Sequence, residues 1–127
     1  MIFPDNVKYS REHEWVRAEG NEGVIGITDF AQKSLGDVVF VDIDTEGETL
    51  TAGERFGTVE AVKTVSDLFI PIDGKVIAVN TALEHAPETV NKDPYGEGWM
   101  IRIQINNLGD LDGLMSAAEY EEFTGEL

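Results

Sequence analysis

Cysteine is missing from all 127 residues of the sequence. Without it the chain can form no disulfide, no thiolate metal site and no cysteine nucleophile. The absence is consistent with a cytoplasmic protein. Histidine is also scarce, and no second histidine follows His13 four residues later. The helical zinc motif of metalloproteases is therefore excluded.

Basic residues are few. The chain has 9 lysines and arginines against 25 aspartates and glutamates, which gives a net charge of -16. Nucleic acid and anionic membrane surfaces would repel a protein with this charge, so we expect neither as a partner. The acidity predicts proteins with basic docking faces as partners, although solubility alone also accounts for it.

Long apolar runs are missing as well. No segment approaches the roughly 20 apolar residues that a membrane helix needs. The first ten residues, MIFPDNVKYS, have neither the apolar core of a signal peptide nor the arginine-rich character of a transit peptide. We therefore expect a soluble protein that stays in the cytoplasm.

Signatures of self-contained catalysis are missing too. The sequence has no GxSxG elbow, no phosphate-binding loop and no dinucleotide fingerprint. The segment DIDTEGETLTAG begins like a calcium loop at Asp42, but Gly53 stands at the twelfth position, where a bidentate glutamate is required. Carboxylates are so numerous that no acid/base pair can be singled out. We predict no catalytic residue and no metal site.

Short strand-like segments separated by glycines and acidic residues make up most of the chain. The clearest, residues 99–105, alternates apolar and polar side chains as a half-buried strand does. Residues 38–43 (VVFVDI) are nearly all apolar, which predicts a strand covered on both sides. Further strands are predicted at EGVIGI and GKVIAVN, with turns at Gly36, Gly47, Gly53 and Gly74. Such a series favours an antiparallel sandwich or barrel.

Two short helices are predicted beside these strands. The first covers residues 28–35, because Thr28 can cap it and Gly36 suits its end. The second covers residues 116–124, where Ser116 and Glu119 have the spacing of a capping box and Gly125 provides a stop. No linker divides the chain, so one domain over residues 1–127 is expected.

One basic side chain, Lys63, interrupts the strand-like segment VEAVKTVSD at residues 59–67. An exposed lysine on an edge strand is the ordinary interpretation. However, strand-like segments of similar length flank it, which predicts that the chain reverses there in a hairpin. The segment has neither glycine nor proline to support a tight turn. A lysine at a protruding tip would be open to an acylating enzyme and could carry a mobile arm.

The surroundings of Lys63 resemble the attachment domains of biotin and lipoyl carriers. In these carriers a Gly-acidic-x-apolar-x-x-Gly stretch precedes the modified lysine, and here the matching residues are Gly47, Glu48, Leu50 and Gly53. Biotin domains usually flank their lysine with methionine, whereas this chain has Val62 and Thr64. This departure disfavours biotin.

The resemblance extends over nearly the whole chain. Four blocks in the same order are similar to the H-protein family of the glycine cleavage system: KYSREHEWV, GITDFAQKSLGDVVFVDI, VEAVKTVSDLFIPIDGKVIAVN and VNKDPYGEGWMIRI. The resemblance implies a mainly β, lipoyl/biotinyl-type antiparallel β sandwich (barrel-sandwich hybrid) with short helices. It also implies lipoate, attached covalently as N6-lipoyl-lysine at Lys63, and a carrier component with no enzyme activity of its own.

The implied function lies in glycine catabolism and one-carbon metabolism. In the family, the swinging arm takes an aminomethyl group from a pyridoxal-phosphate glycine decarboxylase (P protein) to a tetrahydrofolate-dependent aminomethyltransferase (T protein). Electrons then pass to dihydrolipoamide dehydrogenase (L protein). A lipoylating enzyme is the fourth implied partner. The alternatives are a lipoyl or biotinyl carrier of another pathway and an unmodified interaction protein of the same fold.

Further site residues are hypotheses that follow from this resemblance. Glu14 and Asp67 would hold the loaded arm in a surface cleft through charge-assisted hydrogen bonds. Alternatively they are two more surface acids among 25. Glu60, Val62, Thr64 and Asp67 would let the lipoylating enzyme or another partner recognise the hairpin. Trp15, His13 and Tyr95 lie in the matching blocks and are interpreted as packing residues.

Overall fold

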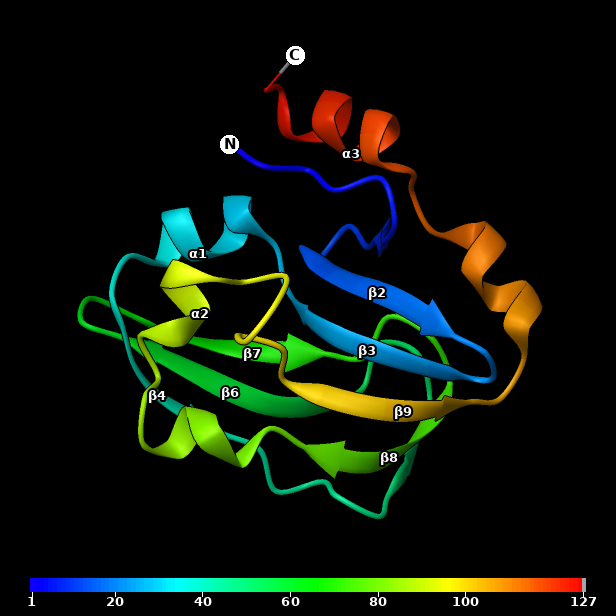
Figure 1. The fold of residues 1–127 in the computed structure, drawn as a ribbon, viewed down its shortest axis with the longest axis horizontal. Helices are drawn as coiled ribbons and strands as arrows, with labels where there is room; N and C mark the ends of the chain where they lie inside the picture. Colours follow the sequence, from blue (N-terminus) through cyan, green and yellow to red (C-terminus); the bar gives the residue numbers. More distant parts are fainter. Residues whose placement is uncertain (127) are drawn as a thin grey trace.

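The computed structural model describes residues 1–126 and consists mainly of antiparallel strands in two sheets (Figure 1). Every strand pair is antiparallel. The larger sheet has the strand order β1-β2-β3-β9-β8-β5. Its strands are β1 (Lys8–Tyr9), β2 (Glu14–Glu19), β3 (Glu22–Ile27), β9 (Ile101–Ile105), β8 (Gly74–Val79) and β5 (Thr49–Leu50).

The smaller sheet has three strands in the order β4-β6-β7. They are β4 (Val38–Asp42), β6 (Arg55–Ala61) and β7 (Val65–Phe69). Inward-facing side chains of both sheets, including Val59 and Leu68 from the small sheet and Ile25 and Ile103 from the large one, belong to one buried cluster. The predicted β sandwich is therefore confirmed, since two sheets bury their apolar faces against each other.

The predicted strand at residues 99–105 begins two residues later than expected. Ile101, Ile103 and Ile105 are buried, whereas Gln104 is exposed and Arg102 is half-buried. The alternation of one packed and one wetter face is thus confirmed.

The prediction that residues 38–43 form a strand covered on both sides is wrong. Val38 and Val41 are buried, but Val39, Phe40 and Asp42 are exposed. The register with β6 shifts between Val38 and Phe40, and such a β-bulge re-aims side chains. β4 is also an edge strand whose outer face meets solvent.

Both predicted helices are present. Thr28 caps α1 (Asp29–Leu35) by accepting a hydrogen bond from the Ala31 N–H, and Gly36 ends it with a φ of 80°. In α3 (Ala117–Thr124) the Ser116 and Glu119 side chains form the full capping box. Gly125 ends this helix in the left-handed conformation. No helix in residues 1–126 is long and apolar enough to cross a membrane.

The turn predicted at Gly74 lies just before it, at residues 71–72, and Gly74 begins β8, as the predicted strand GKVIAVN does. The sequence interpretation did not identify three short helical segments. These are η1 (Thr81–Glu84), α2 (Thr89–Lys92) and η2 (Leu108–Gly113). Each is only one or two turns long, so its residues carry little helical periodicity.

A second buried cluster lies between the large sheet and α3. It contains Val7, Tyr9, Trp15, Val24 and Tyr120. The Tyr9 and Tyr120 rings stack with their centroids 4.6 Å apart. Trp15 is fully buried, and Tyr95 packs at the edge of the cluster. The packing interpretation of Trp15 and Tyr95 is therefore confirmed, and α3 is held on the sheet by aromatic contacts.

Candidate functional site

Lys63 lies where the chain reverses between β6 and β7. Glu60 pairs with Val65 across the two strands, and the Ala61 N–H donates to the Thr64 carbonyl at 2.7 Å. These contacts leave a three-residue loop, residues 62–64, in which the Val62 N–H donates to the Asp37 carbonyl. The lysine is exposed, and it belongs to the loop that joins the paired strands β6 and β7. Figure 1 shows the chain reversing between these two strands.

The other hairpin residues singled out from the sequence all have accessible side chains. Glu60, Val62, Thr64 and Asp67 are each exposed, and Val62 is the most exposed large apolar residue of the part described. Glu60 and Asp67 lie on the outer face of the small sheet, because they alternate with the buried Val59, Ala61 and Leu68. An approaching protein could contact all four together with the lysine.

The end of the Lys63 side chain lies against the turn that follows α1. Its Cε atom is 3.6 Å from the position that a Cβ would take on Gly36. The two residues before this glycine, Ser34 and Leu35, line a surface cavity of about 290 Å³. The end of the Lys63 side chain thus lies beside the turn whose two preceding residues line that cavity.

The cavity lies between the start of β2, α1 and β7. Its apolar lining residues are Ile27, Phe30, Ala31, Leu35, Val59 and Leu68. The polar groups are Glu12, His13, Glu14, Ser34, Ser66 and Asp67. Glu14 and Asp67, 53 positions apart in sequence, are therefore brought to one cavity.

Glu14 is not a surface acid, because its exposed fraction is 2%. The Ser10 hydroxyl donates to Oε1 at 2.8 Å, and the Phe69 N–H approaches Oε2 at 3.4 Å. Burial raises the pKa of Glu14 to about 8, although these two hydrogen bonds oppose the shift. In residues 1–126 no lysine, arginine or histidine forms an ion pair with this carboxylate. A cation in the cavity would favour its ionised form.

Asp67 differs from Glu14 in its surroundings. Its side chain is 55% exposed, and Oδ1 lies 3.6 Å from Nε of Arg55. An exposed pair of this kind contributes little to stability and exchanges partners readily. Asp67 therefore lines the cavity from an exposed position beside Arg55, whereas Glu14 is a buried part of the lining.

A hairpin turn between β1 and β2 fixes the position of Glu14. The Ser10 N–H donates to the Glu14 carbonyl at 2.9 Å, and the His13 N–H donates to the Ser10 carbonyl at 3.2 Å. His13 takes the left-handed position of this turn, with a φ of 71° that usually calls for glycine or asparagine. The turn aims the side chain that follows it into the cavity.

His13 does more than pack. Its Nδ1 lies 2.8 Å from the Tyr120 hydroxyl, which also lies 2.8 Å from Oγ1 of Thr28. Burial lowers the pKa of His13, which favours the neutral ring. Through the Tyr120 hydroxyl, α3 thus contacts both His13 in the β1–β2 turn and Thr28, the residue that caps α1. Ser10 and Tyr120 were missed by the sequence interpretation, because their partners are distant or formed by a turn that the sequence does not signal.

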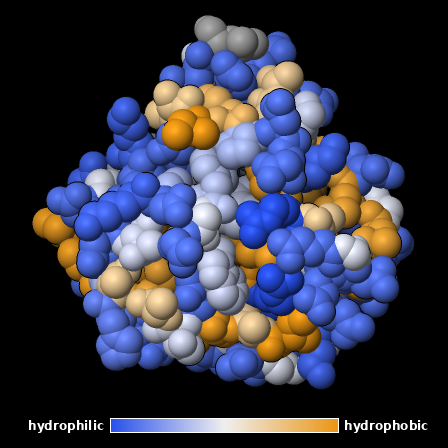
Figure 2. Space-filling model, viewed as in Figure 1, coloured by the Kyte–Doolittle hydropathy of each residue, from blue (hydrophilic) through white to orange (hydrophobic). Residues whose placement is uncertain are grey.

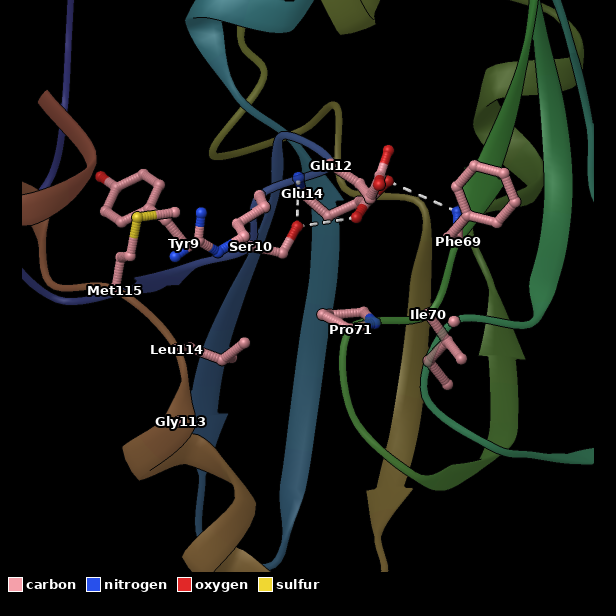
Figure 3. A pocket seen from close by; sticks show the side chains of 12 residues that line it. Tyr9, Ser10, Glu12, Glu14, Phe69, Ile70, Pro71, Gly113, Leu114 and Met115 are labelled. Carbon is pink, nitrogen blue, oxygen red and sulfur yellow. Dashed lines mark hydrogen bonds between the residues drawn. The ribbon is translucent and has the colours of Figure 1, made fainter. Parts of the chain in front are cut away.

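A second cavity of about 280 Å³ lies on the other side of Glu14 (Figure 3). Tyr9, Leu114 and Met115 line one side of it, and Ile70 and Pro71 line the other. Glu12 and Glu14 line both cavities. In Figure 3 the Glu14 carboxylate lies between Ser10 and Phe69. The carboxylate is therefore part of the wall that separates two hollows.

Comparisons with known proteins agree with one another. A family model described as "Glycine cleavage H-protein" matches residues 7–127. The glycine cleavage system H protein of Bacteroides fragilis is 62% identical over 121 residues, covering 95% of this chain and 96% of the relative. That of Symbiobacterium thermophilum is 56% identical over 123 residues, covering 97% and 96%. A crystal structure of a glycine cleavage system H protein from Mycobacterium marinum superposes with a TM-score of 0.87 at 41% identity, covering 96% of this chain and 98% of that one.

Proposed function

The chain belongs to the glycine cleavage H-protein family, and from that premise we propose that it is the lipoyl carrier of a glycine cleavage system. It would take the aminomethyl group from the P protein to the T protein and pass electrons to the L protein. Residues 1–127 would act as a single lipoyl-carrier domain, with no catalytic residue of its own.

The observation that carries this proposal is the exposed amine of Lys63 at the reversal between two paired strands. An amide-linked arm needs a primary amine that an enzyme can reach and a support that does not yield when the arm moves. Lys63 meets both needs, and its side chain ends beside a cavity with apolar and acidic walls. The residues present therefore fit a lipoyl group. When bound, such a group supplies a disulfide that can be reduced and can take up a one-carbon unit.

The cavity residues would protect what the arm carries. We assign to Glu14 and Asp67 the ammonium end of the aminomethyl group, held through charge-assisted hydrogen bonds. Support comes from the buried Glu14 carboxylate, which in residues 1–126 has hydrogen-bond donors but no cationic partner. Pairing with a cation would compensate part of the free energy that its burial costs. The apolar wall would exclude water from the carried group.

The exposed hairpin residues would guide proteins to the lysine. Glu60 and Asp67 offer carboxylates to a basic surface, while Val62 and Thr64 flank the amine directly. We assign these four residues to recognition by the lipoylating enzyme or by another partner. Their exposure supports this role, because none of them is needed for the core.

Intact mass and peptide mapping after co-expression with a lipoylating enzyme test the attachment site. We expect one lipoyl group on the peptide containing Lys63 and none in Lys63→Arg, which keeps the charge. Lys75→Arg is the matched control, because Lys75 is also exposed but lies within a paired strand. A biotinyl group, or an unmodified Lys63, would reject the lipoyl assignment.

Reconstitution with the P protein and labelled glycine then tests the pathway. Label should appear on the lipoylated chain and not on Lys63→Arg. A lipoylated chain that no glycine decarboxylase loads would be a carrier of another pathway.

The cavity assignment is tested by the lifetime of the loaded group. Glu14→Ala and Asp67→Ala proteins, loaded and then separated from the enzymes, should lose the group to hydrolysis faster than the wild type. Wild-type lifetimes in both variants would reject the assignment.

A further inference from the structure

The carboxyl of Glu14 is set apart from the acidic surface of the protein. Hydrophilic side chains cover much of the face shown in Figure 2, so exposed acids are ordinary in this molecule. Glu14 is instead 2% exposed, in a chain whose net charge is -16. Solubility does not account for a buried carboxyl that forms no ion pair within residues 1–126. The hydrogen bonds around it indicate what it does.

The Ser10 side chain holds this carboxyl through two hydrogen bonds. Its Oγ accepts from the Glu14 backbone N–H at 3.0 Å and donates to Oε1 at 2.8 Å. Ser10 is itself buried, with an exposed fraction of 8%. A hydroxyl has one hydrogen and a backbone N–H can only donate, so the hydroxyl hydrogen points to Oε1. Ser10 thereby fixes which carboxyl oxygen accepts.

The proton of a neutral Glu14 therefore belongs on Oε2. Oε1 already accepts from the Ser10 hydroxyl, whereas Oε2 has a long contact of 3.4 Å with the Phe69 N–H. A neutral carboxyl carries one O–H donor beside its remaining acceptor capacity. Figure 3 shows the carboxyl between Ser10 and Phe69. Phe69 belongs to β7, the strand that also carries Asp67, so Oε2 lies toward the acidic side of the cavity lining.

Titratable groups surround Glu14 on several elements. Within residues 1–126, α1 and η2 add no charged side chain to the lining of either cavity. Burial raises the pKa of the two tyrosines and lowers that of the histidine, so these three stay neutral near pH 7. The groups that line either cavity are Tyr9, Arg11, Glu12, His13 and Asp67, and Tyr120 adjoins them from α3 through its contact with His13.

The charged members of this set do not neutralise Glu14. The Arg11 guanidinium lies over the Phe123 ring, and Arg55 lies beside Asp67. Burial, and to a smaller extent the charge of Glu12, raise the pKa of Glu14 to about 8. Glu14 thus keeps its proton at neutral pH until a base or a cation enters the cavity.

The chemistry of the carried group makes the position of this proton matter. In an aminomethyl group on sulfur, the amine and the sulfur share one carbon. A neutral amine can push its lone pair toward that carbon: a C=N bond forms, the C–S bond breaks, and the sulfur leaves with the electron pair. Water then attacks the carbon. A protonated amine has no free lone pair and cannot begin this sequence, so protonation protects the group.

We propose that Ser10 is a positioning residue that makes Oε2 of Glu14 the proton donor to the carried amine. This rests on the proposed function and deepens it, because protection then comes from a protonated nitrogen as well as from exclusion of water. When a neutral amine enters, the O–H bond of Oε2 breaks and leaves its electron pair on oxygen, while the nitrogen lone pair takes the proton. The product is an ammonium beside a carboxylate whose Oε1 is still held by Ser10.

Carbon-13 NMR of the Glu14 carboxyl tests the positioning in the unmodified chain, without any arm. Ser10→Ala removes a hydrogen bond that favours the carboxylate, so the titration midpoint of Glu14 should rise by about one pH unit. Ser10→Thr keeps the hydroxyl and should titrate like wild type. Ser66→Ala is the matched control, because Ser66 lines the cavity but its hydroxyl contacts the Asp67 carbonyl at 3.4 Å. Glu14→Gln identifies the signal, and melting curves check the fold.

The lifetime of the loaded group as a function of pH tests the proton transfer. Proteins loaded by the P protein with labelled glycine are separated from it and followed at pH 6, 7 and 8. At pH 6 both the amine and Glu14 are protonated, so Ser10→Ala should match wild type. At pH 8 the two groups share one proton, and Ser10→Ala should lose the label about tenfold faster, because its carboxylate is less stabilised. Ser66→Ala should behave as wild type at each pH.

The other outcomes would overturn the proposal. An unchanged Glu14 midpoint in Ser10→Ala overturns the positioning role, and so does an equal shift in Ser66→Ala. A lifetime shortened by the same factor at every pH would show that Ser10 is merely structural, and the carrier function would stand. A wild-type chain that is never lipoylated or loaded overturns the proposed function itself, and the proton transfer with it, whatever the NMR titration shows.

Discussion

Glu14→Gln tests how the buried acid in the cavity lining changes the pH dependence of the free energy of unfolding. Glutamine has nearly the same shape and can still accept the hydrogen bond that the Ser10 hydroxyl donates at 2.8 Å. It cannot ionise. The substitution therefore removes one titration from a site whose exposed fraction is 2%, with little change in packing.

The sign of the effect follows from the raised pKa. In the unfolded chain Glu14 loses its proton near its ordinary pKa of 4.5, whereas in the folded protein burial keeps the proton until about pH 8. The folded state thus binds more protons between these values, and stability falls as pH rises. Each pKa unit corresponds to about 1.4 kcal/mol, so a shift from 4.5 to about 8 destabilises the wild type by about 5 kcal/mol at pH 9 relative to pH 4.

Urea unfolding of both proteins at pH 5, 7 and 9 measures this difference. Comparing the two chains cancels the titration of the other acidic groups. We expect the free energy of unfolding of Glu14→Gln, relative to wild type, to increase with pH by several kcal/mol. Asp67→Asn is the control and should show a change below about 1 kcal/mol, because the Asp67 carboxylate and its ion pair are exposed. A difference between wild type and Glu14→Gln that stays flat from pH 5 to 9 would refute the reasoning.

Three other substitutions test the supports of the site. Gly26→Ala should destabilise the protein by about 1–3 kcal/mol in urea unfolding, because its Cβ would lie 2.8 Å from the Trp15 indole, while Gly113→Ala, with open space around it, should be nearly neutral. Tyr120→Phe should lower the free energy of unfolding by about 1–3 kcal/mol, since two hydrogen bonds of its hydroxyl are lost. Ser116→Ala should cost about 1 kcal/mol through loss of the capping box, seen as a lower Tm. Wild-type stability in any of the three would contradict the corresponding contact.

The elements that the sequence predicted well are those set by local chemistry. Thr28 and Ser116 cap their helices because a hydroxyl beside free N–H groups needs no distant partner. The alternation of buried and exposed side chains around Ile103 also has a local origin, because successive residues of a strand point to opposite faces of the sheet. The reversal at Lys63 was located from the similar length of its flanking segments.

The remaining features depend on pairing between distant segments. The apolar residues at 38–43 do not reveal the bulge that exposes Phe40, because a bulge exists only in the pairing of β4 with β6. Glu14 looked like one acid among many, and its burial follows from the turn at His13 and from β7. Tyr120 reaches His13 across 107 positions. No local pattern encodes these contacts, since each requires the finished fold.

The edges of the small sheet have a consequence for the protein in a crowded solution. β4 and β7 end that sheet on either side, and edge strands are where a strand from another molecule could pair. Side chains already occupy part of both edges, because the Val38 N–H donates to Asn91 and the Phe69 N–H approaches Glu14. Asp42 and Asp67 are exposed on these two strands. Their negative charges repel a strand of the same acidic protein but do not repel a protein with a basic surface. The same carboxylates thereby oppose edge-to-edge aggregation through the small sheet, whose β6–β7 loop carries the exposed Lys63.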